Sequence, residues 1–144
     1  LARAIMSAKR KKQPIETTSQ LREIVEQVVL RTKPENPKEA VKKTCQRVFQ
    51  ALRIDVNSEF EVLDSFLEAL PHILKPGGKA AILTFHSGED RMVKKSFQYY
   101  AREGIYSDIA KDVIRPSAKE CASNPRARST KFRWAVRSDV QKYE

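Results

Sequence analysis

Residues 74–91, LKPGGKAAILTFHSGEDR, decide how this chain folds. Helically spaced apolar residues lead up to Leu74, and a Pro-Gly-Gly turn then precedes the apolar run at residues 80–83. The run ends in polar residues, and Glu89 and Asp90 place negative charge where the first turn of a helix favours it. The stretch therefore predicts a helix, a buried strand and a second helix, which is the basic element of an open α/β sheet.

The residues just past this strand are the first candidates for a functional site, because ligands of open α/β sheets bind beyond the carboxyl ends of the strands. His86 suits either of two roles there, lining a ligand pocket or capping the following helix. Glu89 and Asp90 could act as an acid/base pair or form an ordinary charged helix start. Both alternatives stay open at the level of sequence.

The pattern argues against several other kinds of site. A serine hydrolase would need a Gly-x-Ser-x-Gly elbow, which is missing, and the only other histidine is His72. Gly77 and Gly78 precede the strand instead of following it, so they do not form a phosphate-binding loop. Cys45 and Cys121 lack any metal-ligand spacing, so we expect no metal site. No apolar run is long enough to cross a bilayer, so we expect no membrane partner.

The formal charge of +10 is concentrated at the two ends of the 144-residue chain. Residues 1–53 carry 13 basic and 5 acidic side chains, and residues 111–144 carry 9 basic and 4 acidic ones. Residues 54–110 carry 6 basic and 9 acidic side chains. Basic ends around a neutral-to-acidic centre indicate two surfaces that attract a polyanion, although solubility and a lysine-rich helix end at residues 9–12 would also explain them.

The remaining elements follow from hydrophobic periodicity. Helical spacing predicts helices over residues 1–10, from Thr18 or Ser19 to about 30, over 37–57 and over 59–74, with a later helix from about 89 to 104. Val113 and Ile114 form a possible short strand, and Ser117 opens a short helical turn. Residues 130–137 alternate between an apolar face and a basic face, which predicts a half-buried antiparallel strand at the end of the sheet. Two or three strands are few for an independent α/β domain, so the chain looks incomplete.

A second candidate region begins at Asn124. The dipeptide Asn124-Pro125 resembles the start of the Asn-Pro-Pro-aromatic motif of amino-group methyltransferases, but Arg126 and Ala127 replace the proline and the aromatic residue. The cations that follow stand close to an aromatic side chain and suit phosphate contacts and base stacking, a solvated loop being the alternative. These cations are Arg126, Arg128, Lys131 and Arg133, next to Trp134.

Taken together, six ordered strings between residues 14 and 129 resemble the MraW/RsmH family of S-adenosylmethionine-dependent small-subunit (16S) rRNA cytosine-N4 methyltransferases. They are PIETTSQLREIV (14–25), FQALRIDVN (49–57), LKPGG (74–78), FHSGEDR (85–91), RPS (115–117) and NPRARS (124–129). One departure is local: Gly88 stands where the family commonly has leucine. A larger departure is that the family's glycine-rich cofactor loop and its acidic ribose-binding residue have no counterpart in these residues.

The resemblance implies an α/β fold, namely the second half of a class I (Rossmann-like) methyltransferase core plus part of an inserted helical domain. Residues 1–48 would belong to the insertion, which serves substrate recognition, and residues 49–144 to the core. The implied activity is methyl transfer from S-adenosylmethionine to the N4 amine of a cytidine in small-subunit rRNA. The implied location is the bacterial cytoplasm or an organelle, and cofactor-binding residues are expected outside this chain.

Residue roles follow from the motifs as hypotheses. His86, Ser87 and Asn124 are candidates for shaping the acceptor pocket, because an amine nucleophile needs positioning more than acid/base help. The candidates for holding RNA phosphates are Arg53, Arg126, Arg128, Lys131 and Arg133. The partner is small-subunit rRNA or the ribosomal subunit, and a partner chain or a missing N-terminal segment would complete the sheet. Two rival hypotheses are a non-catalytic RNA-binding or ribosome-associated remnant without the cofactor half, and a truncated chain that pairs with another subunit.

Overall fold

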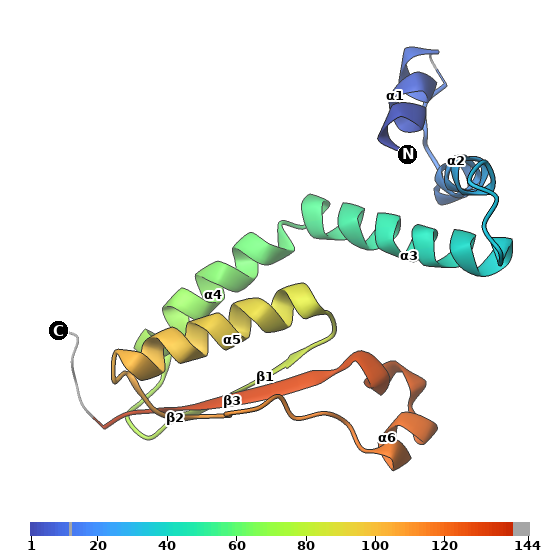
Figure 1. The fold of residues 1–144 in the computed structure, drawn as a ribbon. Helices are drawn as coiled ribbons and strands as arrows, with labels where there is room; N and C mark the ends of the chain where they lie inside the picture. The colour runs from blue at the N-terminus through green and yellow to red at the C-terminus, as the bar shows by residue number, and fades with distance from the viewer. Residues whose placement is uncertain (12, 140–144) are drawn as a thin grey trace. The chain divides into compact units, whose positions relative to one another are not determined.

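Helices occupy the first half of the chain, and a small sheet with helices occupies the second half (Figure 1). A computed structural model describes residues 1–11 and 13–139, so Lys12 of the basic helix end and residues 140–144 lie outside the described residues. In chain order the elements are α1 Ala2–Arg10, α2 Thr18–Leu30, α3 Pro37–Val56, α4 Glu59–Ile73, β1 Lys79–Thr84, α5 Ser87–Arg102, β2 Tyr106–Ile109, α6 Ala118–Ser123, the 3₁₀ helix η1 Pro125–Ser129 and β3 Lys131–Arg137.

The chain divides into two units, Leu1–Asn57 and Ser58–Glu144. The predicted domain boundary at 48/49 falls inside α3, which continues without a break to Val56. The assignment of residues 1–48 and 49–144 to two functional domains stays a prediction. Across the described ranges 1–11 and 13–139, no helix is long and apolar enough to span a membrane.

The first unit is a set of helices whose ends are fixed by side-chain caps. Thr17 begins α2 with a capping box, in which its Oγ1 accepts a hydrogen bond from the Gln20 N–H and the Gln20 side chain accepts one from the Thr17 N–H. Asn36 caps α3 in front of Pro37, which occupies the first turn. Helices α2 and α3 bury Val25, Val29 and Val41 between them, as the apolar spacing predicts.

The second unit contains an antiparallel three-stranded sheet in the order β1-β3-β2. Helices α4 and α5 lie side by side over one face of it (Figure 1). Residues from α4, α5 and all three strands form its core, which comprises Leu67, Leu70, Ala80, Val93, Phe97, Tyr106 and Ala135. The predicted helix–strand–helix element is therefore confirmed as α4-β1-α5.

The Pro-Gly-Gly turn fits its place between α4 and β1. Gly77 has φ +69, a value that favours glycine, and its N–H donates to the Arg137 carbonyl at 2.9 Å. A Cβ on Gly78 would come within 2.7 Å of the Lys75 carbonyl oxygen. The turn thus brings the start of β1 against the end of β3.

Two predictions about the strands are wrong. The strand at residues 131–137 is central in the sheet and not at its end, because β2 pairs on its second side. The edge strand β2 was not predicted, and Ile114 contributes only an isolated bridge to Phe132. The sequence Tyr-Ser-Asp-Ile of β2 is short and half polar, so hydrophobic periodicity gives little signal there.

The face of β3 that is buried is the one that carries arginines, and not the apolar face that the alternation favours. Arg133, Ala135 and Arg137 lie buried on the helix-covered face, whereas Phe132 and Trp134 on the other face are only half-buried. The two arginines are accommodated because they find partners. Arg137 donates to the carbonyls of Pro71 at 2.9 Å and Ile105 at 3.0 Å, and Arg133 pairs with Asp90.

Candidate functional site at the edge of the sheet

His86 ends the strand segment by capping α5. Its Nδ1 accepts hydrogen bonds from the backbone N–H groups of Gly88 at 3.2 Å and Glu89 at 3.4 Å. The ring also packs edge-on against Phe60, with 5.7 Å between ring centroids. Of the two alternatives for His86, the capping role is the one that the geometry shows.

Glu89 closes the same turn from the other side. Its Oε2 accepts the Phe85 N–H at 3.1 Å, and its Oε1 lies 3.2 Å from Nε2 of His86. Nε2 is fully buried and makes no hydrogen bond within the described residues. Because Nδ1 accepts two N–H groups, the proton of a neutral His86 resides on Nε2, facing the carboxylate. His86 and Glu89 therefore hold the turn together, and Glu89 belongs to the charged helix start together with Asp90.

A third acidic group, Glu59 of α4, lies near this pair. One ligand atom from each of Glu59, His86 and Glu89 falls within 4.8 Å of the others, a spacing that a metal ion could bridge. A metal at Nε2 would move the proton to Nδ1, where it would face two backbone N–H groups. The capping geometry disfavours that arrangement, so the absence of a metal site stays our prediction.

Asp90 has a different structural role, because it links α5 to β3. Its carboxylate receives Nε of Arg133 at 2.7 Å and Nη2 at 3.2 Å, a bidentate ion pair whose side chains are 14% and 8% exposed. The hydrogen bond from Arg133 holds the pKa of Asp90 below its usual value against the opposing effect of burial, and the charges of Lys131 and Arg115 act in the same direction as Arg133. The assignment of Arg133 to RNA phosphates is corrected here, because this guanidinium lies under the helix and is already paired.

The sheet register brings the two candidate regions to one edge. Thr84, the last residue of β1, pairs with Lys131, the first residue of β3. The turn that contains Ser87 and the loop that starts at Asn124 therefore leave the sheet at the same end, as Figure 1 shows for α5 and η1. The direction of the strand in the sequence predicted that the Ser87 turn lies at this edge. The pairing of β1 with β3 shows that the Asn124 loop lies there as well.

At this edge the side chains of Ser87 and Asn124 are exposed. Asn124 caps η1 by accepting the Arg126 N–H at 3.2 Å, and the same oxygen has a second lone pair. Arg126 and Arg128 are exposed and Lys131 is half-buried, so these three can still meet an anion. Arg53 is exposed as well, but it belongs to α3 in the first unit.

Two residues that were not singled out from the sequence also belong to this edge. Phe85 follows β1 with 58% of its surface exposed, while its backbone is held by Glu89. Arg115 is exposed and near enough to lower the pKa of Asp90. In the sequence, Arg115 was indicated only by the string Arg115-Pro-Ser117, which by itself suggests no role for this residue.

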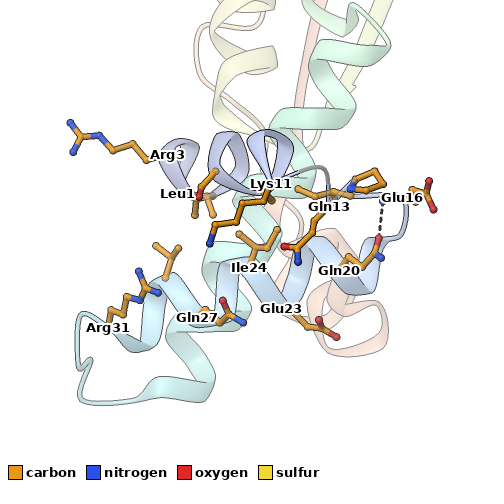
Figure 2. Close-up of a pocket in the computed structure, with 16 residues that line it drawn as sticks. Leu1, Arg3, Lys11, Gln13, Glu16, Gln20, Glu23, Ile24, Gln27 and Arg31 are labelled. Atoms are coloured by element: carbon orange, nitrogen blue, oxygen red, sulfur yellow. Dashed lines mark hydrogen bonds between the residues drawn. The ribbon is translucent and has the colours of Figure 1, made fainter.

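A large open cleft lies elsewhere, between α1 and α2 in the first unit. It has a volume of about 970 Å³, and its walls mix apolar residues with charges of both signs. Figure 2 shows Lys11 and Ile24 extending into the space between the two helices, and the backbone of Glu16 bonded to the Gln20 side chain. Its lining includes neither the turn at Ser87 nor the loop at Asn124, so we keep the sheet edge as the candidate site.

Comparison with known protein families decides the relationship. The model of the MraW methylase family matches residues 1–138. The chain belongs to the MraW methylase family. This membership confirms the resemblance that the six strings suggested.

Curated relatives carry a related description. The chain is 62% identical over 139 residues to a "Ribosomal RNA small subunit methyltransferase H 1" of Agathobacter rectalis, covering 96% of this chain and 40% of that protein. It is 60% identical over 139 residues to the protein of the same description from Lachnoclostridium phytofermentans, covering 96% and 38%. A "Ribosomal RNA small subunit methyltransferase H" of Crocosphaera subtropica is 43% identical over 140 residues, with 96% and 42% covered. The chain thus spans about two fifths of the length of these relatives.

Proposed function

We propose that this chain supplies the acceptor side of an enzyme that transfers a methyl group from S-adenosylmethionine to the N4 amine of a cytidine in small-subunit rRNA. The family membership and the names of the relatives support methyl transfer to ribosomal RNA. The observation that carries the proposal is the meeting of the Ser87 turn and the Asn124 loop at one edge of the sheet. The choice of cytidine as the target nucleotide and of S-adenosylmethionine as the methyl donor rests on the resemblance of the six strings.

The second unit would then be part of a class I methyltransferase core. Its helix–strand–helix order agrees with such a core. Residues 1–48 would belong to the inserted substrate-recognition domain and residues 49–144 to the core. The relatives named above are bacterial proteins, so we infer that the RNA is met in bacterial cytoplasm and not in an organelle.

We infer that the described residues do not form a site for the methyl donor by themselves. In residues 1–11 and 13–139, the paired glycines Gly77 and Gly78 precede β1, whereas a donor-binding loop would follow a strand. We expect the 144 residues alone to be inactive, because they correspond to about two fifths of the relatives' length.

The chemistry left to this chain is the orientation of the acceptor. An exocyclic amine presents N–H groups, and the Asn124 carbonyl and the Ser87 hydroxyl can accept hydrogen bonds from them. Holding the amine in line accounts for most of the assistance that such a nucleophile needs. His86 would act through the turn that it caps, as a positioning residue for Ser87.

The RNA contacts would come from exposed cations next to this edge. Arg126, Arg128 and Lys131 stand on the loop and strand that follow Asn124, where they can bind phosphates and fix the register of the RNA. Arg53 would contribute from the first unit. Arg133 is omitted because its partner is Asp90.

A chimera tests the proposal. These 144 residues would replace the matched two fifths of the Agathobacter rectalis relative, and the product would be incubated with small-subunit RNA and tritiated S-adenosylmethionine. We expect label in RNA and N4-methylated cytidine in the nuclease digest. RNA binding without methyl transfer, from a chimera that folds and binds the donor, would favour the non-catalytic remnant instead.

A further inference from the structure

One face of α3 forms a second cationic surface, which extends from Arg53 and the string at residues 49–57 back to residues that no motif includes. Its members recur at spacings of three and four residues, so they share one side of the helix. With Phe49 beside them they line a shallow concavity of about 620 Å³. We call them the α3 stripe, and they are Lys43, Gln46, Arg47, Gln50 and Arg53.

The orientation of the α3 stripe within its unit is fixed by the opposite side of the helix. Val41 is buried against α2, and Cys45 and Val48 pack at the same contact. All five residues of the α3 stripe are exposed. The stripe is therefore a solvent-facing surface of a helix that is already packed.

The chemistry of the α3 stripe suits a regular polyanion. Residues 40–54 contain no acidic side chain, so this part of the helix carries a net positive charge. Glu39 pairs with Lys43 at 3.5 Å, but both side chains are largely exposed, and such pairs are weak in water. The glutamine amides between the cations can donate to phosphate and sugar oxygens.

The dimensions fit a nucleic acid strand. From Lys43 to Arg53 the helix rises about 15 Å. A strand in a duplex presents one phosphate for about every 3.4 Å of axis. Several phosphates can therefore lie along the α3 stripe at once.

We propose that the α3 stripe binds the phosphate backbone of RNA, so that the first unit holds the substrate on a surface of its own. This inference rests on the proposed function, because it names where the same RNA substrate is gripped outside the sheet edge. An acidic protein segment is the competing partner, and the test below separates the two.

The test compares two triple variants of the full 144-residue chain by anisotropy of a fluorescein-labelled RNA hairpin. One carries Lys43→Gln, Arg47→Gln and Arg53→Gln. The matched control carries Lys94→Gln, Lys95→Gln and Arg102→Gln, which removes the same charge from exposed positions of α5. Circular dichroism checks that both keep their helices, as expected for exposed side chains.

Salt dependence gives the expected result. Each lost phosphate contact lowers the slope of log affinity against log salt by about 0.9 for a duplex, so the α3 variant loses about 3 and binds roughly 500-fold more weakly near 0.1 M salt. The control keeps a slope within about 0.5 of the unmodified chain. Equal slopes and affinities for the two variants would overturn the proposal while leaving RNA binding intact.

Two further outcomes separate the alternatives. If the unmodified chain shows no salt-dependent RNA binding, both this proposal and RNA recognition by these residues are wrong. If poly-L-glutamate of equal charge displaces the hairpin as effectively as unlabelled RNA does, the α3 stripe is a site for acidic protein, and the RNA assignment is overturned.

Discussion

The two faces of the small sheet differ in which side chains they bury, and the sequence of β3 alone does not predict this difference. On the helix-covered face, Arg133 and Arg137 are buried with 7% and 9% of their surface exposed. On the other face, Leu83 is 57% exposed and pairs with the half-buried Phe132. A strand can therefore bury its arginines and expose its apolar residues when the buried face supplies a carboxylate and backbone carbonyls as acceptors.

The difference matters for the site. The ion pair between Asp90 and Arg133 ties the first turn of α5 to β3, and Asp90 follows directly after Glu89, which holds the backbone of Phe85. The helix-covered face thus fixes the geometry of the turn that carries Ser87. The other face contributes little to that geometry, so substitutions on the two faces should differ in their effect on stability.

The largest effect is expected from Asp90→Ala. It leaves the guanidinium of Arg133 buried without its carboxylate, so the free energy of unfolding should fall by about 3 kcal/mol. Urea unfolding of the 144-residue chain measures it. Asp64→Ala, on the exposed side of α4, is the control and should change stability by less than about 0.5 kcal/mol. Equal losses for the two variants would contradict a structural ion pair.

A smaller effect follows from the titration of Asp90. Its pKa is lowered in the folded state, so it binds a proton more readily in the unfolded chain. The ion pair therefore contributes its full stabilisation above 3.8, the ordinary pKa of an aspartate side chain, and this is lost as the pH falls through the lower folded pKa. Urea midpoints measured across that acidic range should fall more steeply for the unmodified chain than for Asp90→Asn. Parallel curves would show that Asp90 does not titrate with folding.

The smallest effect is expected on the other face. Leu83→Gln replaces an exposed apolar side chain, so the stability of this chain should change by less than about 0.5 kcal/mol. The same urea assay measures it, with Val93→Ala as the buried comparison, for which about 1 kcal/mol or more is expected. A loss at Leu83 as large as that at Val93 would mean that the two faces are equally important.

Local patterns predicted the parts of the fold that local chemistry determines. The helix–turn–strand–helix order of residues 59–102 follows from spacing, the Pro-Gly-Gly turn and the acidic first turn of α5. The choice of buried face in β3 does not follow from local patterns. It depends on Asp90 and Pro71, which lie 43 and 66 residues away from their arginine partners. Alternation alone favours the apolar face as the buried one.

The candidate site was predictable to a similar degree. The position past β1 follows from the strand direction, and Ser87 and Asn124 were singled out from the family strings. Two features depend on the tertiary structure: His86 serves as a helix cap, and the pairing of Thr84 with Lys131 brings both segments to one edge. The role of Arg133 and the buried face of β3 were both mispredicted, because the partner Asp90 lies 43 residues away in the sequence.

The most direct test of the central claim, that this edge orients the methyl acceptor, is the turnover of the chimera with Asn124→Ala. Ser117→Ala is the matched control, because Ser117 likewise caps a short helix in the same region by accepting the Glu120 N–H at 3.1 Å. Losing either cap should cost similar stability, about 1 kcal/mol. We predict that kcat falls roughly 100-fold for Asn124→Ala and stays within about twofold for Ser117→Ala, since a misplaced acceptor loses its in-line geometry. Equal kcat values for the two variants would contradict the assignment of this edge as the acceptor site.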